Sequence, residues 1–224
     1  MPGDRLAGRH VASRTWARIR ARGPGEVRRL VTDRFMEAVG SGDTLVVFTL
    51  ASRAHPPSTD DLLFRSATPE DGEAFARDIG TDSPGSFRAR LSPTTSCFVI
   101  EANGRLLHSS WVTTSGAWTR ELRSYLRPPQ GGAYIYESFT RPDARGKGLY
   151  PTALRGIASD AFERGLDSLW VAVEAGNHSS LRAVSKVGFI PVSRLDYRRR
   201  WGRMTLRIPT PGEPGGDGLR IERT

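Results

Sequence analysis

The residues best suited to chemistry lie in the stretch TRPDARGKGLYPTALRG, residues 140–156. Gly146 and Gly148 stand directly before an apolar helical pattern, so we expect a strand–turn–helix junction there. The first N–H groups of a helix have no partner within the helix, and the helix dipole adds positive potential at that end. Glycine keeps side chains out of the way of an approaching ligand. The pattern therefore predicts an anion site, and phosphate is its usual occupant.

Two common phosphate motifs are excluded at this turn. A P-loop requires G-x-x-x-x-G-K-[ST], whereas here Gly148 follows Lys147 and no Ser or Thr is in place. The dinucleotide fingerprint G-x-G-x-x-G fails because Pro151 stands at the third glycine position. Neither nucleoside triphosphate binding nor dinucleotide binding is predicted.

Other kinds of reactive site receive little support. The four histidines are scattered without metal-ligand spacing, and no G-x-S-x-G elbow is present, so no metal site and no serine nucleophile are predicted. Cys97 begins an apolar run and is expected to be a buried small residue. Trp111 and Trp118 flank a loop that lines an acceptor pocket in one interpretation, although ordinary packing is the commoner outcome.

The elements that must position these residues follow from periodicity and turn signals. Asn103-Gly104 predicts a two-residue hairpin turn within 96–114. Helices are expected after Thr68, after the glycine turn, and over 177–189, where Gly188 is a stop residue. The predicted strands cover residues 44–50, 61–67, 133–140 and 168–176, with one or two more over 190–208. This order indicates an α/β domain with a mixed sheet.

Two stretches resemble the GNAT acetyltransferase superfamily. RPDARGKGLYPTAL is similar to its acyl-CoA pyrophosphate loop, [RQ]-x-x-G-x-[GA]: Arg145 and Gly148 match, while Tyr150 stands where a small residue is commoner. NHSSLRAVSKVGF is similar to the superfamily's N-x-x-[AS]-x-x-x-x-x-K-x-G-F segment, and LLFRSATPEDGEAFA to its first strand and helix. The matching positions of the second stretch are Asn177, Ser180, Lys186, Gly188 and Phe189. The resemblance covers about residues 61–207.

The resemblance implies a GNAT fold, in which a mixed central sheet is flanked by helices. Two strands, 133–140 and 168–176, would splay around a cleft for the cosubstrate acetyl-CoA. Backbone groups of Phe139 and Thr140 would hold the pantetheine arm and the acetyl carbonyl, and Asn177 and Ser180 would contact the arm or the phosphates. The pyrophosphate would be held by backbone amides of Arg145, Gly146, Lys147, Gly148, Leu149 and Tyr150. Asn177 is equally suited to cap the helix that follows it.

The implied reaction is the direct attack of an amine on the thioester, which requires a proton acceptor for the amine and a proton for the departing thiolate. Glu137 is the only acidic residue in AYIYESFT, so it is the candidate for proton removal or substrate binding. A solvated residue or a structural ion pair is the alternative. Many relatives have a tyrosine where Val184 stands, so Tyr150, Tyr136, Ser138 and water remain open as the acid. Tyr150 is the first of these to test.

Charge is unevenly distributed along the chain, whose net charge is +9. Residues 1–34 hold nine arginines against three acidic residues. Residues 1–43 are expected to form a basic helical extension that packs on the domain, lies on an anionic membrane or binds a partner. Residues 44–208 are expected to form the acetyltransferase domain, and residues 209–224 a disordered tail rich in glycine and proline.

The predicted function is acetyl transfer from acetyl-CoA to the primary amine of a small molecule, such as an amino sugar or a biosynthetic intermediate. A loose similarity to acetyltransferases of bacterial cell-surface glycan pathways suggests the amino sugar. The alternatives are protein or peptide N-acetylation, and a non-catalytic module that binds nucleic acid or a membrane surface through its basic start. Nucleic acid is not the favoured partner, and a homodimer is left open. A single cysteine and the lack of a signal-peptide pattern predict a cytoplasmic location.

Overall fold

The computed structural model describes residues 42–51, 62–119, 122–200, 203–207 and 218–223. The predicted basic extension lies outside the described residues except for Gly42 and Asp43, which begin the first strand. Most of the predicted tail also lies outside them. None of the helices in the described ranges is long and apolar enough to span a membrane.

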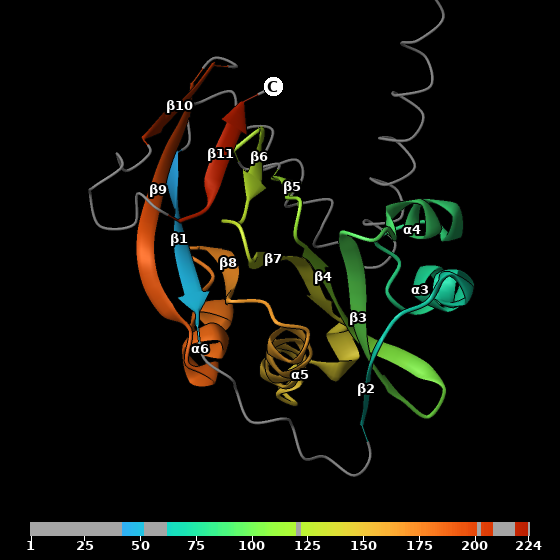
Figure 1. Ribbon diagram of the computed structural model, residues 1–224. Helices are drawn as coiled ribbons and strands as arrows, with labels where there is room; N and C mark the ends of the chain where they lie inside the picture. Colours follow the sequence, from blue (N-terminus) through green and yellow to red (C-terminus); the bar gives the residue numbers. More distant parts are fainter. Residues whose placement is uncertain (1–41, 52–61, 120–121, 201–202, 208–217, 224) are drawn as a thin grey trace, which may run out of the picture.

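The larger sheet has eight strands among the described residues, in the order β10-β9-β1-β8-β7-β4-β3-β2 (Figure 1). Neighbouring strands are antiparallel except for β7 and β8, which are parallel, so the sheet is mixed as predicted. Its strands are β1 (Gly42–Leu50), β2 (Leu63–Ser66), β3 (Thr95–Ala102), β4 (Arg105–Thr113), β7 (Gly132–Thr140), β8 (Ser168–Glu174), β9 (Ile190–Arg200) and β10 (Arg203–Arg207). The predicted hairpin is confirmed as β3 and β4, because Asn103 and Gly104 both have positive φ, as a two-residue turn of this type requires.

Helices cover both faces of the sheet (Figure 1). On one face, α5 and α6 pack on a cluster that contains Val112 of β4 and Ile135 of β7. On the other face, α3 and α4 pack on Trp111. Successive side chains of a strand point to opposite faces, which explains why Trp111 and Val112 meet different helices. The helices are α3 (Gly72–Asp78), α4 (Pro84–Arg90), α5 (Leu149–Glu163) and α6 (His178–Val187), with short 3₁₀ turns η1 (Pro69–Asp71) and η2 (Pro142–Ala144).

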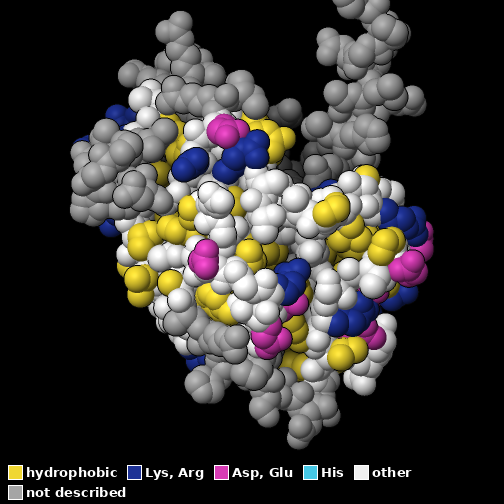
Figure 2. Space-filling view, viewed as in Figure 1, with side chains coloured by type: hydrophobic (Ala, Val, Ile, Leu, Met, Phe, Trp, Pro, Cys, Tyr) yellow, Lys and Arg dark blue, Asp and Glu magenta, His cyan; other side chains and the backbone are white. Residues whose placement is uncertain are grey.

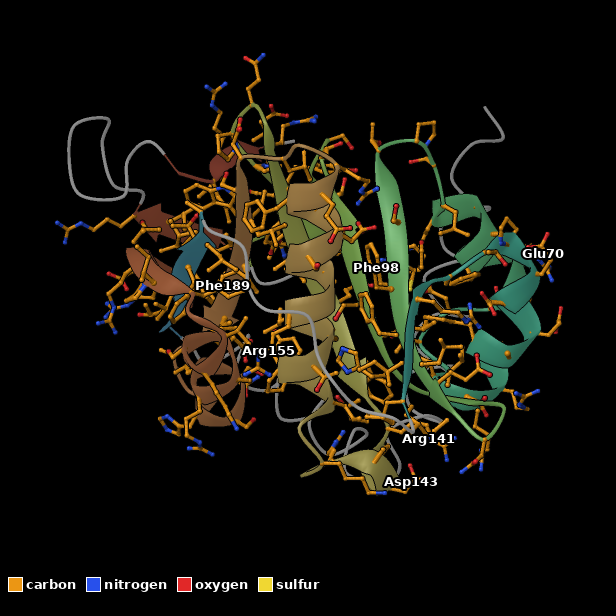
Figure 3. The ribbon with its side chains drawn as sticks, turned by 60° about the horizontal axis from the view of Figure 1, so that its bottom comes forward. Glu70, Phe98, Arg141, Asp143, Arg155 and Phe189 are labelled. Atoms are coloured by element: carbon orange, nitrogen blue, oxygen red, sulfur yellow. The ribbon has the colours of Figure 1, made fainter. Side chains whose placement is uncertain are left out.

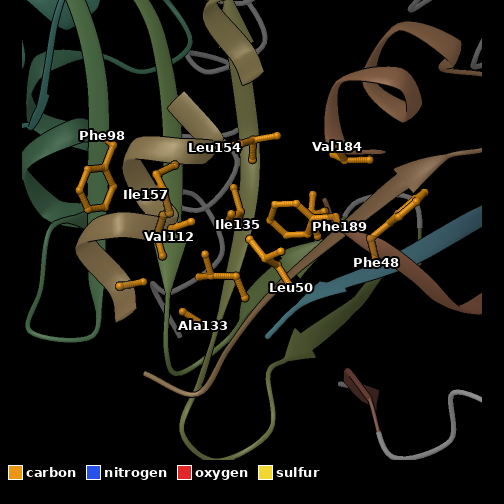
Figure 4. Close-up of a cluster of buried hydrophobic side chains, with 14 of the residues drawn as sticks. Phe48, Leu50, Phe98, Val112, Ala133, Ile135, Leu154, Ile157, Val184 and Phe189 are labelled. Atoms are coloured by element: carbon orange, nitrogen blue, oxygen red, sulfur yellow. The ribbon is translucent and has the colours of Figure 1, made fainter. Parts of the chain in front are cut away.

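Val184 belongs to the core under α5 and α6. Its side chain is fully buried in one cluster with Phe189, which directly precedes β9, and with Phe48 and Leu50 of β1 (Figure 4). The position at which the family resemblance leads us to expect a tyrosine is thus filled by a core side chain. Its hydrocarbon is removed from water and is part of the packing that holds α6 against the sheet.

Strands β7 and β8 separate partway along their length. Their parallel pairing runs from Gly132 opposite Ser168 to Ile135 opposite Val171. Both strands continue beyond this point, β7 to Thr140 and β8 to Glu174. The predicted splay between these two strands is therefore confirmed.

A β-bulge reshapes β7 just after the pairing with β8 ends. Ser109 of β4 lies opposite Phe139, but Trp111 lies opposite Tyr136, so two residues of β7 face one of β4. Glu137 has φ +46, a left-handed conformation that is uncommon for a residue other than glycine. The extra residue reverses the alternation, so Phe139 joins the cluster under α3 and α4.

A second, three-stranded sheet corrects the prediction of a disordered C-terminal tail. It consists of β5 (Ala117–Thr119), β6 (Ser124–Arg127) and β11 (Arg220–Arg223), and β11 pairs antiparallel with β6 (Figure 1). Ile221 lies opposite Leu126 and packs on a buried cluster with it. The prediction was wrong at Arg220–Arg223 because composition was averaged over a glycine- and proline-rich segment. The short apolar pair Leu219 and Ile221 was thereby overlooked.

Candidate active site

The glycine turn between β7 and α5 has the geometry of an anion site. Gly146 and Gly148 have φ values of +78 and +73, and Gly148 is the N-cap residue of α5. A Cβ atom added at either glycine would meet nothing within 4 Å, so the turn faces open space. Leu149 and Tyr150 form the first helical turn, where N–H groups point out of the helix end. These features fit the pyrophosphate of acetyl-CoA.

Ion pairs of the largely buried Arg141 stabilise the start of this turn. The Arg141 guanidinium donates to both carboxylate oxygens of Asp143, at 3.0 and 2.6 Å, and both residues flank the start of η2 near α5 (Figure 3). Arg141 also lies 3.6 Å from Asp78 of α3. Asp78 accepts the backbone N–H of Leu106 at 3.1 Å. Burial opposes the charge of Asp78, but Arg77, the Leu106 N–H and Arg105 outweigh it and keep the pKa of its carboxyl below the usual value.

Glu137 is ion-paired in the structure. Its carboxylate lies 2.8 Å from the guanidinium of Arg90, the last residue of α4, while the Glu137 side chain stays 34% exposed. The other side of Arg90 pairs with the fully buried carboxylate of Asp82 at 2.5 Å. The guanidinium also stacks 3.8 Å above the Trp111 ring. The ion pair expected as the alternative role of Glu137 is present, and its exposure leaves the carboxylate accessible.

Arg90 lies between two carboxylates. Burial works against the charge of the guanidinium, but the carboxylates of Glu137 and Asp82 raise its pKa above the usual value. Two carboxylates therefore share one cation at the edge of the splay. Trp111 is thus buried beneath this group, whereas Trp118 is exposed on the smaller sheet.

Tyr150 lies at the other side of the splay region, between α5 and the sheet. Burial raises the pKa of its hydroxyl to about 12, although a hydrogen bond with the Ser138 side chain lowers it in part. The ring lies 5.7 Å from that of His108 on β4, centroid to centroid. The bulge at Glu137 is what brings Ser138, rather than its neighbour, to the α5 face of β7.

His108 and Ser110 belong to this region, and sequence reasoning missed them. His108 is only 1% exposed, and its two ring nitrogens lie 2.7 Å from Thr140 Oγ1 and 2.9 Å from Ser110 Oγ. Burial lowers the pKa of His108 to about 3, so its ring is neutral. The alternate positions of His108 and Ser110 in the sequence could have indicated this polar group. That spacing puts both side chains on the face of the strand that packs against the apolar helix α5.

The remaining predicted residues are placed as follows. The Asn177 side chain accepts the backbone N–H of Ser180 at 3.2 Å, so it caps α6. Phe139 and Leu149 bury their side chains, which leaves only their backbones for a ligand. Arg145 donates to the backbone carbonyl of Thr140 at 3.4 Å. Lys147 is exposed in the turn. Within the described residues, no cluster of His, Cys, Asp and Glu could hold a metal ion.

The fold and the site together define an α/β protein with a glycine-containing strand–turn–helix and a splayed pair of parallel strands. The family model described as the Acetyltransferase (GNAT) family matches residues 61–189, more than half of the chain. The chain therefore belongs to the GNAT acetyltransferase family, whose cosubstrate is acetyl-CoA. None of the curated proteins compared matches it significantly.

Solved structures share the fold at low sequence identity. A putative GNAT acetyltransferase from Novosphingobium aromaticivorans is 16% identical, with 74% of this chain and 64% of that one covered and a TM-score of 0.51. A GCN5-related N-acetyltransferase from Sphaerobacter thermophilus is 14% identical, with coverages of 75% and 55% and a TM-score of 0.53. One from Kribbella flavida is 16% identical, with coverages of 78% and 63% and a TM-score of 0.52. The chain thus spans between 55% and 64% of the length of these three proteins.

Proposed function

We propose that this protein transfers the acetyl group of acetyl-CoA to the primary amine of a small molecule by direct attack, with an amino sugar or a biosynthetic intermediate as acceptor. One observation carries the proposal. The strand that splays from β8 bears the accessible carboxylate of Glu137 and leads straight into the glycine turn. Glu137 would bind the amine and the glycine turn would bind the pyrophosphate, so the two groups that the transfer requires would come from one strand–turn–helix unit.

The turn would hold the pyrophosphate of acetyl-CoA through its backbone. The residues from Arg145 to Tyr150 each carry an N–H group, and Pro151 after them carries none. The positive end of the α5 dipole adds to the attraction of an anion. Acetyl-CoA, when bound, supplies the activated acyl group. The splay beyond Ile135 gives the pantetheine arm a path toward Glu137.

Glu137 would bind the acceptor in its ammonium form and receive its proton, directly or through water. The Glu137 side chain is 34% exposed beside Arg90, so the ammonium group of an acceptor can reach its carboxylate. Because Arg90 stabilises the carboxylate form, relay of the proton to water is favoured over its storage on Glu137. The amine nitrogen then becomes the nucleophile.

Small molecules are favoured over large polyanions as partners by the charge of the domain. Figure 2 shows Lys and Arg on the visible face interspersed with Asp and Glu, rather than gathered in one basic stripe. A nucleic-acid partner relies on such a stripe. We place the reaction in the cytoplasm, where acetyl-CoA is available to the enzyme.

An acceptor screen tests the proposal. Release of free CoA thiol from acetyl-CoA would be followed with amino sugars, aminoglycosides, amino acids and polyamines. At least one amine should raise the rate well above that of hydrolysis, and Glu137→Gln should raise the KM for that amine. If CoA binds but no small amine stimulates release, the small-molecule assignment is wrong. Comparison of protein acetylation with and without the gene would then test protein acceptors.

A further inference from the structure

A continuous row of polar side chains runs from Tyr150 to Thr140, and hydrogen bonds join its members from Ser138 to Thr140. The Tyr150 hydroxyl lies beside the Ser138 side chain, which lowers the pKa of Tyr150 as a hydrogen-bond partner, and the Tyr150 ring lies 5.7 Å from that of His108. Ser138 Oγ lies 2.8 Å from Ser110 Oγ, which lies 2.9 Å from His108 Nε2. His108 Nδ1 lies 2.7 Å from Thr140 Oγ1. Three elements, β4, β7 and α5, contribute to this chain of neutral groups.

The hydrogen bonds of this chain can all be donated in one direction or all in the other, and the tautomer of His108 selects the direction. With a proton on Nε2, His108 donates to Ser110, Ser110 donates to Ser138, and Ser138 donates to Tyr150. The Tyr150 hydrogen is then directed away from the chain. With a proton on Nδ1, the donor and acceptor of each of these bonds exchange roles, and the Tyr150 hydroxyl donates its hydrogen to Ser138.

The direction of the hydrogen bonds matters because Tyr150 is partly buried against the core beneath α5. Burial makes a tyrosine hydroxyl hold its proton more tightly, and a hydrogen bond donated to its oxygen stabilises the tyrosinate. A chain polarised toward Tyr150 therefore makes it a better acid, and successive bonds of one direction strengthen one another. When the chain is polarised the other way, the Tyr150 hydrogen is donated to Ser138 and is not available to the departing sulfur.

We propose that His108 is a positioning residue, which acts through Ser110 and Ser138 to present the Tyr150 hydroxyl as a proton donor toward the sulfur of the bound thioester. The inference rests on the proposed acetyl transfer. In that reaction the N–C bond forms and the C–S bond breaks, and the sulfur leaves as a thiolate. The thiolate takes the proton of Tyr150. Tyr150 regains a proton from solvent, which balances the one that the amine nitrogen releases.

The tautomer can be measured without any turnover. Protein labelled with ¹⁵N-histidine would be examined by NMR with and without CoA, and the His108 signals identified by their loss in His108→Gln. In the CoA complex, His108 should be the Nε2–H tautomer. The Nδ1–H tautomer in that complex would overturn the inference while leaving the proposed function intact. Absence of CoA binding would instead count against the proposed function.

Kinetic variants test the chain as a unit. His108→Phe and Ser138→Ala should each lower kcat about tenfold or more, with the KM for acetyl-CoA changed less than twofold, since general acids contribute about a hundredfold or more. His108→Gln keeps a donor toward Ser110 and should retain most of the rate. Ser109→Ala is the matched control, because Ser109 is a buried serine of the same strand whose hydroxyl has no partner among the described residues. Thermal unfolding would confirm that each variant is folded.

A double variant separates positioning from general damage. In a Tyr150→Phe background, adding His108→Phe should change kcat less than twofold, because the hydroxyl on which the chain acts is already gone. If the two losses multiply, or if His108→Gln is as slow as His108→Phe, then His108 does not act through Tyr150.

Discussion

The charge at residue 148 should decide how tightly the turn binds CoA. Gly148 has φ +73 and open space where a Cβ would stand, so a side chain fits but the backbone is strained by about 1–2 kcal/mol. Asn and Asp tolerate this conformation better than most residues. Gly148→Asn and Gly148→Asp carry the same strain and nearly the same shape. The difference between them therefore isolates one negative charge at the N-terminus of α5.

The size of the difference follows from Coulomb's law. Two unit charges about 4 Å apart in water interact by about 1 kcal/mol. A pyrophosphate carries two negative charges beside the turn, so the Asp variant should bind CoA about 1–2 kcal/mol more weakly than the Asn variant. That is roughly a tenfold increase in Kd. An acid at the N-terminus of a helix is itself stabilising, so Gly148→Asp should unfold no more easily than Gly148→Asn.

Isothermal titration calorimetry with CoA at two salt concentrations would measure both variants. The Debye length shrinks from about 10 Å at 0.1 M salt to about 3 Å at 1 M, so the gap between the variants should narrow at high salt. Dephospho-CoA, which keeps the pyrophosphate, should show the same gap. Equal affinities of the two variants at low salt would mean that the turn does not face the pyrophosphate, and the reasoning about α5 would be refuted.

Three further predictions concern the groups around the site. Arg90→Met removes the guanidinium that contacts both the buried carboxylate of Asp82 and the carboxylate of Glu137, so urea unfolding should show a loss of about 3–5 kcal/mol, clearly more than in Glu137→Gln; similar losses would argue against a shared role of Arg90 for the two carboxylates. Burial lowers the pKa of His108 to about 3, whereas an unfolded histidine titrates near about 6.5. The contribution of His108 to the free energy of unfolding is therefore complete above pH 6.5. It is lost as pH falls toward 3, by about 1.4 kcal/mol per pH unit. Between pH 7 and pH 5 the protein should lose about 2 kcal/mol more than His108→Gln does, and parallel losses would contradict this. Asn177→Ala should cost about 1 kcal/mol of stability, whereas Asn177→Ser keeps the helix cap. If Asn177→Ser keeps its stability but binds CoA more weakly, Asn177 contacts the ligand directly.

Local signals in the sequence predicted much of the secondary structure. The Asn103-Gly104 turn and the cap of α6 depend on residues close in the chain, so their geometry follows from local backbone preferences. Thr68 is a further case, because its backbone N–H donates to the Asp71 carboxylate at 2.7 Å, three residues away. The strand at 44–50 was also readable from its apolar run. Its place between β8 and β9 was not, because pairing across more than a hundred residues leaves no local trace.

By itself the sequence determined the turn before α5, since Gly146 and Gly148 permit the left-handed backbone that ends one element and begins the helix. It also determined that Glu137 is the only acidic residue of its strand. Only the tertiary structure decided what Glu137 meets, because Arg90 reaches it from a helix on another part of the chain. The same holds for the polar chain from Tyr150 to His108. A single bulge at Glu137 sets which side chains face α5, and that choice depends on the register of β4 against β7 rather than on either sequence alone.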